Sequence, residues 1–141
     1  MKKSFKGIYR PTNPKKYVGN PNNIVYRSLL ERRFMVYCDT NPGIVQWASE
    51  ELPIRYYNPI DKKVHKYYPD FIVKTENKTV MVEIKPKKYL SKPKYNQRKT
   101  KRYYTESYNY IKNNAKWKAA REYCEDNNIE FKIFTEKELG I

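Results

Sequence analysis

Residues 67–86 read YYPDFIVKTENKTVMVEIKP, in which two short apolar runs are separated by a polar turn. The runs at 71–73 and 79–84 are rich in β-branched and aromatic side chains, so the pattern predicts an antiparallel hairpin. A turn centred on Glu76 and Asn77 places Asp70 directly opposite Glu83. A turn one residue later places Asp70 opposite Lys85 instead, and a three-residue loop places it opposite Ile84.

The side chains at the end of this hairpin suggest metal chemistry. Alternate residues of a strand share a face, so Glu83 and Lys85 point the same way and Ile84 points the other way. Two carboxylates about 5 Å apart repel each other unless a cation lies between them. We therefore predict a site for Mg²⁺, which Mn²⁺ can replace, bound by Asp70, Glu83 and the backbone carbonyl of Ile84. Such an ion polarises a phosphate and acidifies a bound water, while Lys85 orients the nucleophile or neutralises developing charge.

Glu31 is a further candidate for this site. Apolar residues recur at three- and four-residue spacing between Tyr26 and Cys38, which predicts a helix capped by Asn22 or Asn23. Glu31 lies at the edge of the apolar stripe, where it can face the sheet and reach the metal through a water. Its spacing from Ser28 also fits a capping box, and neighbouring arginines offer it ordinary ion pairs.

The chain has 141 residues with 30 Lys and Arg against 15 Asp and Glu, a net charge of +15. Two blocks carry this charge: residues 1–33 hold nine basic residues and one acid, and residues 85–105 hold nine basic residues and no acid. Both blocks are interleaved with tyrosine, which favours a nucleic-acid partner over a membrane surface. We predict DNA contacts from Arg27, Lys87, Lys88, Lys92, Lys94, Arg98, Lys99, Lys101 and Arg102.

The order of predicted elements indicates an α/β protein with one mixed sheet flanked by helices. The strands are expected at 45–49, 52–57, 64–68, 71–73, 79–84 and 129–133, the first five as an antiparallel meander. Helices are expected at 97–111 and around 117–124. Three prolines between residues 11 and 21 predict an extended basic arm over 1–23, followed by a single domain over 24–141.

Several classes of protein are not expected. No apolar run approaches the length that spans a membrane, and the N-terminus lacks the apolar core of a secretory signal. Cys38 and Cys124 lie among apolar neighbours and are predicted to be free, buried thiols in a reduced compartment. Trp47 and Trp117 are predicted to belong to the core. The single His65 is predicted to lie on the surface without a catalytic role.

An acidic residue in a first helix, followed by Pro69-Asp70 and Glu83-Ile84-Lys85, resembles the PD-(D/E)xK nuclease superfamily. More narrowly, the chain is similar to tailed-phage head completion nucleases. That similarity rests on residues 23–31, Tyr37-Cys38-Asp39-x-Asn41-Pro42, Trp47-x-Ser49-Glu50, residues 67–71, 83–86 and 114–120. The TnsA-type endonucleases resemble it more distantly.

This resemblance implies a restriction-endonuclease-like fold and a Mg²⁺-dependent DNase that trims packaged DNA before head and tail join. It implies acidic and lysine roles for Glu31, Asp70, Glu83 and Lys85. It further implies phage head and neck proteins as partners, in the host cytoplasm during assembly or in the virion, without secretion. TnsA-type sites often carry Gln where this chain has Glu83, so either one or two metals fit the pattern.

Two other functions are compatible with the sequence. A non-catalytic DNA-binding protein needs only the basic blocks and the tyrosines. A structural neck protein of the virion needs no chemistry. Loss of Mg²⁺-dependent cleavage without loss of DNA binding on substitution of Glu83 or Lys85 identifies the nuclease.

Overall fold

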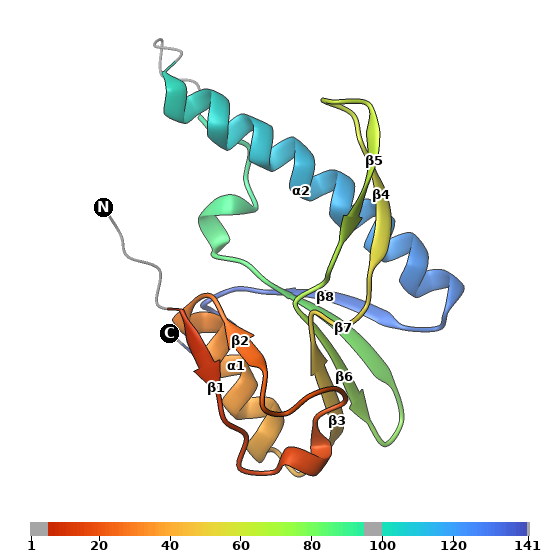
Figure 1. The fold of residues 1–141 in the computed structure, drawn as a ribbon. Coiled ribbons are helices and arrows are strands. Elements are labelled where there is room, and N and C mark those ends of the chain that lie inside the picture. The colour runs from red at the N-terminus through yellow and green to blue at the C-terminus, as the bar shows by residue number, and fades with distance from the viewer. Residues whose placement is uncertain (1–5, 95–99, 141) are drawn as a thin grey trace.

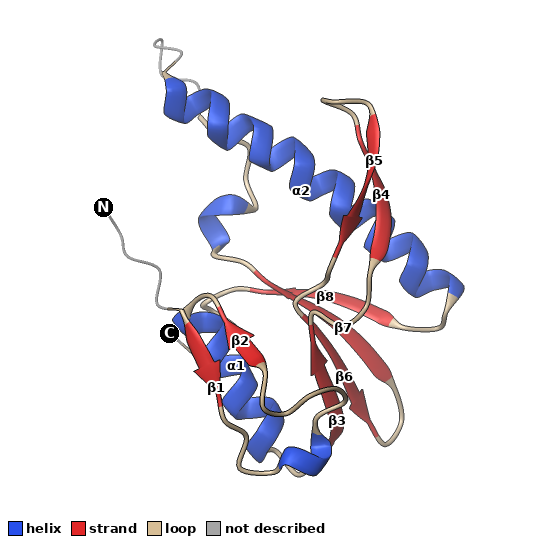
Figure 2. Ribbon diagram, in the orientation of Figure 1, coloured by secondary structure: helices blue, strands red, loops and turns tan. Residues whose placement is uncertain are grey.

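The structure, a computed structural model, describes residues 6–94 and 100–140. It contains two α-helices and eight strands within those residues, together with two short 3₁₀ turns (Figures 1 and 2). In chain order the elements are β1 (Gly7–Tyr9), the turn Pro14–Lys16, β2 (Ile24–Tyr26), α1 (Leu29–Thr40), β3 (Ile44–Ser49), β4 (Ile54–Asn58), β5 (Lys63–Tyr67), β6 (Phe71–Thr75), β7 (Thr79–Ile84), the turn Lys87–Tyr89, α2 (Lys101–Asp126) and β8 (Glu130–Phe134).

The central sheet has four strands in the order β3-β6-β7-β8. β6 pairs antiparallel with both β3 and β7, and β8 pairs parallel with β7. Phe71 pairs with Val82 and Val73 with Val80, so the register is the one that the turn at Glu76 and Asn77 predicts. The predicted α/β class with a mixed sheet is confirmed.

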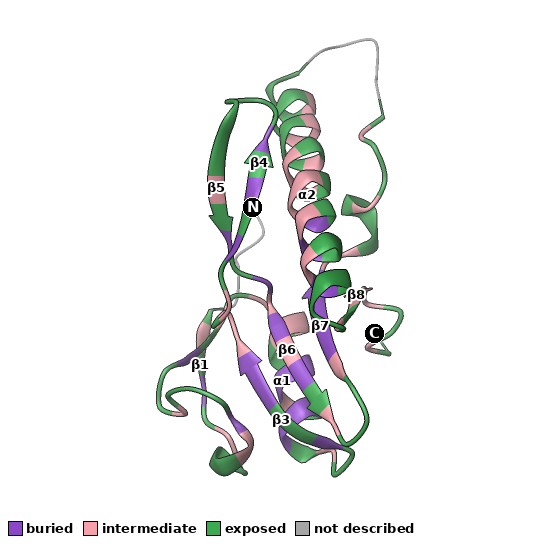
Figure 3. Ribbon diagram, turned by 90° about the vertical axis from the view of Figure 1, so that its right-hand side faces the viewer, coloured by how far each residue is buried: buried purple, intermediate pink, exposed green. Residues whose placement is uncertain are grey.

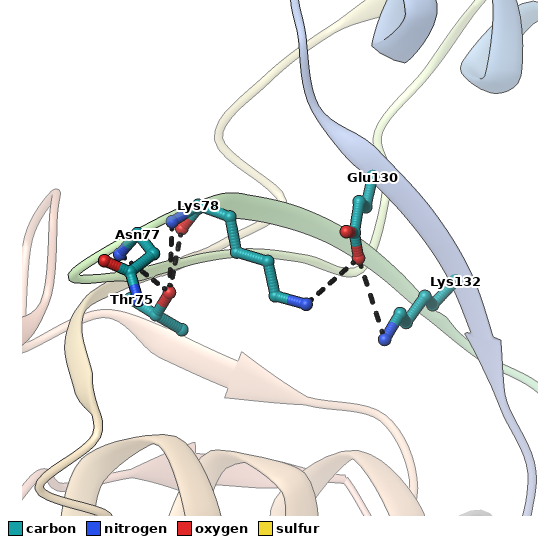
Figure 4. A network of polar contacts seen from close by, with 5 residues as sticks. All are labelled: Thr75, Asn77, Lys78, Glu130 and Lys132. Atoms are coloured by element: carbon teal, nitrogen blue, oxygen red, sulfur yellow. Dashed lines mark hydrogen bonds and ion pairs between the residues drawn. The ribbon is translucent and has the colours of Figure 1, made fainter.

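Local polar contacts fix the turn between β6 and β7 (Figure 4). The Thr75 hydroxyl oxygen accepts the backbone N–H groups of Asn77 and Lys78, at 3.4 and 3.2 Å. The Thr75 N–H donates to the Lys78 carbonyl at 2.9 Å, which closes a two-residue loop. The Lys78 and Lys132 ammonium groups both approach Glu130, at 3.3 and 3.7 Å, and so connect the turn to β8. The turn therefore holds the hairpin in one register.

The two helices cover opposite faces of the sheet, and Figure 3 shows the buried residues between them. One cluster packs Phe34, Met35 and Cys38 of α1 against alternate sheet residues that include Val80, Val82 and Ile84. The second cluster packs Trp117, Ala120 and Cys124 of α2 against Met81. The alternation along β7 thus puts Glu83 on the opposite face from Val82 and Ile84, as predicted.

The predicted five-stranded meander is wrong. β4 and β5 form a separate antiparallel hairpin, and β3 pairs directly with β6. The chain leaves the sheet at Glu50, whose φ of 53° lies in the left-handed region. Glu50 also donates its N–H to the Asp70 carbonyl at 3.1 Å, so the corner is tied to the start of β6. The β4–β5 hairpin then packs its apolar face, including Ile54 and Tyr56, on α2.

The N-terminal segment differs from the predicted arm, because residues 7–23 pack on the domain instead of projecting from it. β1 pairs with β2, and Tyr9 and Tyr17 are buried beside Trp47. The prolines indicated an extended chain, but Tyr9 and Tyr17 belong to the hydrophobic core. Asp39 of α1 holds this segment by accepting hydrogen bonds from the Tyr9 hydroxyl and from two backbone N–H groups of residues 12 and 13, at 2.6 to 2.8 Å.

α1 begins later than predicted. Residues 24–26 form β2, and Ser28 caps the helix by accepting the Glu31 N–H at 3.1 Å. The predicted caps at Asn22 and Asn23 are therefore wrong. A strand partner in β1, which the periodicity of 24–38 does not reveal, takes residues 24–26 out of the helix.

α2 is a single helix of 26 residues where two were predicted. Thr100 caps it by accepting the Tyr103 N–H at 3.2 Å. The weak apolar pattern of its first half reflects exposure, since the buried residues Trp117, Ala120 and Cys124 all lie in its second half. No glycine or proline interrupts the helix between the halves.

The predictions for the cysteines and the tryptophans are confirmed. Cys38 and Cys124 are free and buried, and Trp47 and Trp117 lie in the core. Neither helix in the described ranges has the length and apolar character needed to cross a membrane.

Candidate catalytic site

Asp70 and Glu83 come together where β6 begins and β7 ends. Asp70 directly precedes Phe71, whose partner is Val82, so the hairpin register sets Asp70 across from Glu83. One Asp70 carboxylate oxygen accepts the Ile84 N–H at 2.7 Å. The Glu83 carboxylate accepts a hydrogen bond from the Tyr67 hydroxyl at the end of β5. Both carboxyl groups are therefore held in place by neighbours on the hairpins.

The two carboxyl groups repel each other in a poorly solvated place. The pKa of Asp70 is raised well above its ordinary value by burial first, then by the charges of Glu83 and Glu31. The pKa of Glu83 is raised by burial, against which the Tyr67 hydrogen bond and the charge of Lys85 act. The structure thus concentrates negative charge that the protein leaves only partly compensated.

Glu31 approaches the same strand ends from the first turn of α1. Its carboxylate accepts the Arg27 N–H at 3.0 Å, while its own N–H is held by Ser28. The capping interaction is therefore present, and Glu31 still interacts electrostatically with Asp70. Burial raises the pKa of Glu31, and the charge of Glu50 raises it further.

Lys85 is the cation shared by these carboxyl groups. It follows β7 and donates its N–H to the Phe134 carbonyl at 3.0 Å, so its backbone is fixed to β8. Its positive charge lowers the pKa of each of the carboxyl groups of Glu31, Asp70 and Glu83. Lys85 therefore interacts electrostatically with all three carboxyl groups, and Asp70 interacts with both Glu31 and Glu83.

Three neighbours of the site escape prediction from sequence. Tyr67 is buried and holds Glu83, and burial raises the pKa of its phenol. The Lys116 ammonium of α2 lies 5.4 Å from the centre of the Tyr67 ring, and its charge favours ionised Glu83. Glu50 forms an ion pair with Arg27 and raises the pKa of Glu31. Tyr67 adjoins the Pro69-Asp70 pair in sequence, whereas nothing in the sequence places Lys116 beside it.

The donor set fits a hard divalent cation in chemistry and charge. In the described parts of the chain no three His, Cys, Asp or Glu side chains form a group that could hold a metal by themselves. Asp70 and Glu83 nevertheless offer two facing carboxylates, and desolvation penalises their charge unless a cation joins them. Mg²⁺ is commonly bound by one or two carboxylates and several waters, so a two-carboxylate site suits it.

Part of the predicted DNA-binding set lines one cavity. Lys88, Lys92, Lys94 and Arg102 line a cavity of about 290 Å³ between the segment after β7 and the first half of α2. Lys87 and Lys101 are exposed on the same two segments. Arg102 forms an ion pair with Glu106 at 2.8 Å. Arg98 and Lys99 lie outside the described residues.

Comparison with known proteins shows the family to which the chain belongs. Residues 41–136 match the family described as TnsA-like endonuclease, N-terminal. The chain is also similar to the Head completion nuclease of Enterobacteria phage T4, with 36% identity over 141 aligned residues that cover 96% of this chain and 94% of that protein. The family match includes Asp70, Glu83, Lys85 and all of α2, and it begins after Glu31.

Proposed function

Because the chain belongs to the TnsA-like endonuclease family and is homologous to a phage head completion nuclease, we propose that it is a metal-dependent DNA nuclease of the PD-(D/E)xK type. Its mixed sheet between two helices has the restriction-endonuclease-like architecture that the resemblance implied. The observation that carries the proposal is the facing pair Asp70 and Glu83 beside Lys85, at the ends of β6 and β7.

In this proposal Asp70, Glu83 and the Ile84 carbonyl would hold Mg²⁺, or Mn²⁺ in its place, and Glu31 would act on it through a water. When bound, the ion polarises the scissile phosphate and acidifies a water. Tyr67 keeps Glu83 oriented by its hydrogen bond, and the Asp70 carboxylate is aimed by the Ile84 N–H. Lys85 orients the attacking water and offsets the negative charge that develops on the phosphate.

The biological setting is proposed from the homologue. Head completion implies action on packaged phage DNA, with head or neck proteins as partners, in the host cytoplasm during assembly or in the virion. The basic residues along 87–94 and at the start of α2 would bind the DNA backbone. A non-catalytic DNA-binding or neck protein would use the same basic residues, but it gives no role to two buried carboxylates that repel each other.

Lys85→Met tests the chemistry. Plasmid DNA is incubated at low salt with wild-type protein or the variant, in Mg²⁺ or in EDTA. We expect cleavage that requires Mg²⁺ and falls roughly 10²-fold or more in the variant, since the charge that stabilises the transition state is lost. Lys74→Met removes an exposed lysine of β6 and should cleave normally. Cleavage that persists in EDTA would refute the metal-dependent mechanism.

Binding of Mg²⁺ should also stabilise the folded protein. An ion that binds only the folded state at a hundredfold excess over its Kd adds about 2.7 kcal/mol to the free energy of unfolding. We expect Mg²⁺ to raise the melting temperature of wild-type protein and to leave that of Glu83→Gln unchanged. Equal shifts in both proteins would show that the stabilising ion binds elsewhere.

A further inference from the structure

Along α2, tyrosines and lysines recur every four residues at Tyr104, Tyr108, Lys112 and Lys116, which we call the α2 stripe. Residues four apart are neighbours on a helix surface, so these side chains form a row that winds gradually around α2. The Lys112 ammonium lies 5.9 Å from the centre of the Tyr108 ring. Tyr104 is 55% exposed and Tyr108 38% exposed, so both rings remain accessible.

The stripe ends at the candidate catalytic site. The Lys116 ammonium lies 5.9 Å from the centre of the Tyr56 ring and 5.4 Å from that of Tyr67, the residue that donates its hydroxyl to Glu83. Lys116 also interacts electrostatically with Asp70. The other end of the stripe lies in the half of α2 that reaches away from the sheet (Figure 1). The stripe therefore leads from the outside of the molecule to the carboxyl pair.

The charges along the stripe lack a local counterion in the sequence. Residues 107–121 contain four basic residues and no acid. The pKa of Lys116 is lowered by burial and then by repulsion from Lys112, whereas the charges of Glu83 and Asp70 raise it. A polyanion lying along the stripe would relieve this repulsion. Alternating rings and ammonium groups suit a single nucleic-acid strand, because bases stack on aromatic rings while phosphates meet the cations.

We propose that the α2 stripe binds one unpaired DNA strand and leads its phosphates to Asp70 and Glu83. Bases stack on Tyr104 and Tyr108, and Lys112 and Lys116 contact phosphates. The destination of the strand rests on the proposed nuclease function, whereas the binding of the strand does not. The preferred substrate is then DNA with a single-stranded segment at the point of cleavage.

The experiment measures binding of a fluorescent single-stranded oligonucleotide, and of its duplex, by anisotropy in EDTA, where cleavage cannot contribute. The variant Lys112→Ala with Lys116→Ala is compared with Lys118→Ala with Lys132→Ala, which removes the same charge from other faces. We expect the stripe variant to bind the single strand roughly tenfold more weakly than the control variant. The slope of log K against log salt concentration should be smaller by about 1.4 in the stripe variant than in wild-type protein, because two phosphate contacts are lost. Tyr108→Ala should weaken single-strand binding roughly tenfold and duplex binding much less.

Equal binding by the two double variants would overturn the proposal, as would a loss in Tyr108→Ala that is the same for single strand and duplex. Melting temperatures of all variants exclude misfolding as the cause of any loss. Weaker binding by stripe variants of a protein that proves unable to cleave DNA would support the stripe and refute the nuclease. Normal binding by stripe variants of an active nuclease would refute the stripe alone.

Discussion

Asp70→Asn should abolish DNA cleavage while making the metal-free protein more stable. Asparagine has the same shape, and its side-chain oxygen can still accept the Ile84 N–H. The substitution removes a charge that burial and Glu83 both disfavour, so the folded state gains free energy. The same charge is needed to hold the metal, which stabilises the transition state by several kcal/mol. Loss of the metal should therefore slow cleavage roughly 10³-fold or more. Cleavage assays and thermal melts in EDTA measure the two effects.

Asp126→Asn is the matched control, since it removes an exposed carboxylate from the end of α2. It should cleave DNA at the wild-type rate and melt close to the wild-type temperature. A stability loss in Asp70→Asn would mean that the Asp70 carboxylate is well compensated in the folded protein without a metal. Full activity of Asp70→Asn would remove Asp70 from the mechanism.

The pH dependence of stability follows from the same carboxyl groups. The folded protein holds protons on Asp70 and Glu83 at pH values where the unfolded chain has lost them, because both pKa values are raised on folding. The metal-free protein therefore becomes less stable as pH rises from the ordinary carboxyl pKa near 4 through the folded pKa values. Asp70→Asn should flatten this part of the stability curve.

Asp39→Ala should destabilise the protein by about 3–5 kcal/mol. Asp39 has no exposed surface, and its carboxylate accepts hydrogen bonds from the Tyr9 hydroxyl and from the N–H groups of Thr12 and Asn13. Alanine leaves all three donors without this acceptor and frees the segment of residues 9–13 from α1. Urea unfolding measures the loss. Asp126→Ala, which removes an exposed carboxylate, should change the free energy of unfolding by a few tenths of a kcal/mol at most.

Acid should remove the same stabilisation in wild-type protein. The pKa of Asp39 is lowered in the folded state by these hydrogen bonds and by Lys16, although burial acts in the opposite direction. Its contribution is therefore complete above the unfolded pKa near 4 and is lost as pH falls through the folded pKa. An Asp39→Ala protein that is as stable as wild type would show that the segment is held by other contacts.

The hairpin that carries the site could be predicted from sequence, but its register only as one of three. Its two apolar runs flank a short polar turn, and a period of two then determines which side chains share a face. The pairing of Phe71 with Val82 selects the register with the turn at Glu76 and Asn77. The faces of β7 and the role of both tryptophans in the core were equally readable, because each depends on local alternation or on apolar character.

The arrangement of the other elements depends on tertiary contacts that local patterns do not contain. The left-handed corner at Glu50 takes β4 out of the sheet, although its residues alternate like those of a sheet strand. Pairing with β1 makes residues 24–26 a strand within what looks like a continuous helical pattern. The burial of Tyr9 and Tyr17 depends on Trp47, which lies far along the chain.

The candidate site likewise contains residues that local patterns predict and residues that only tertiary contacts place. Asp70, Glu83 and Lys85 share one hairpin, so their proximity follows from local geometry. Glu31 comes from α1, and the packing of this helix on the sheet had to be inferred. The spacing of Ser28 and Glu31 is compatible both with helix capping and with a role at the site. Lys116 reaches the site because α2 lies across the β4–β5 hairpin, which only the folded structure reveals.

The most direct test of the site is diffraction from crystals soaked in Mn²⁺, with anomalous scattering to locate the metal. We expect a peak between the carboxyl groups of Asp70 and Glu83, close to the Ile84 carbonyl and the Lys85 ammonium. The peak should disappear in Asp70→Asn. Bound Mn²⁺ that avoids both carboxyl groups, or a peak of equal height in the variant, would contradict a metal centre at this hairpin.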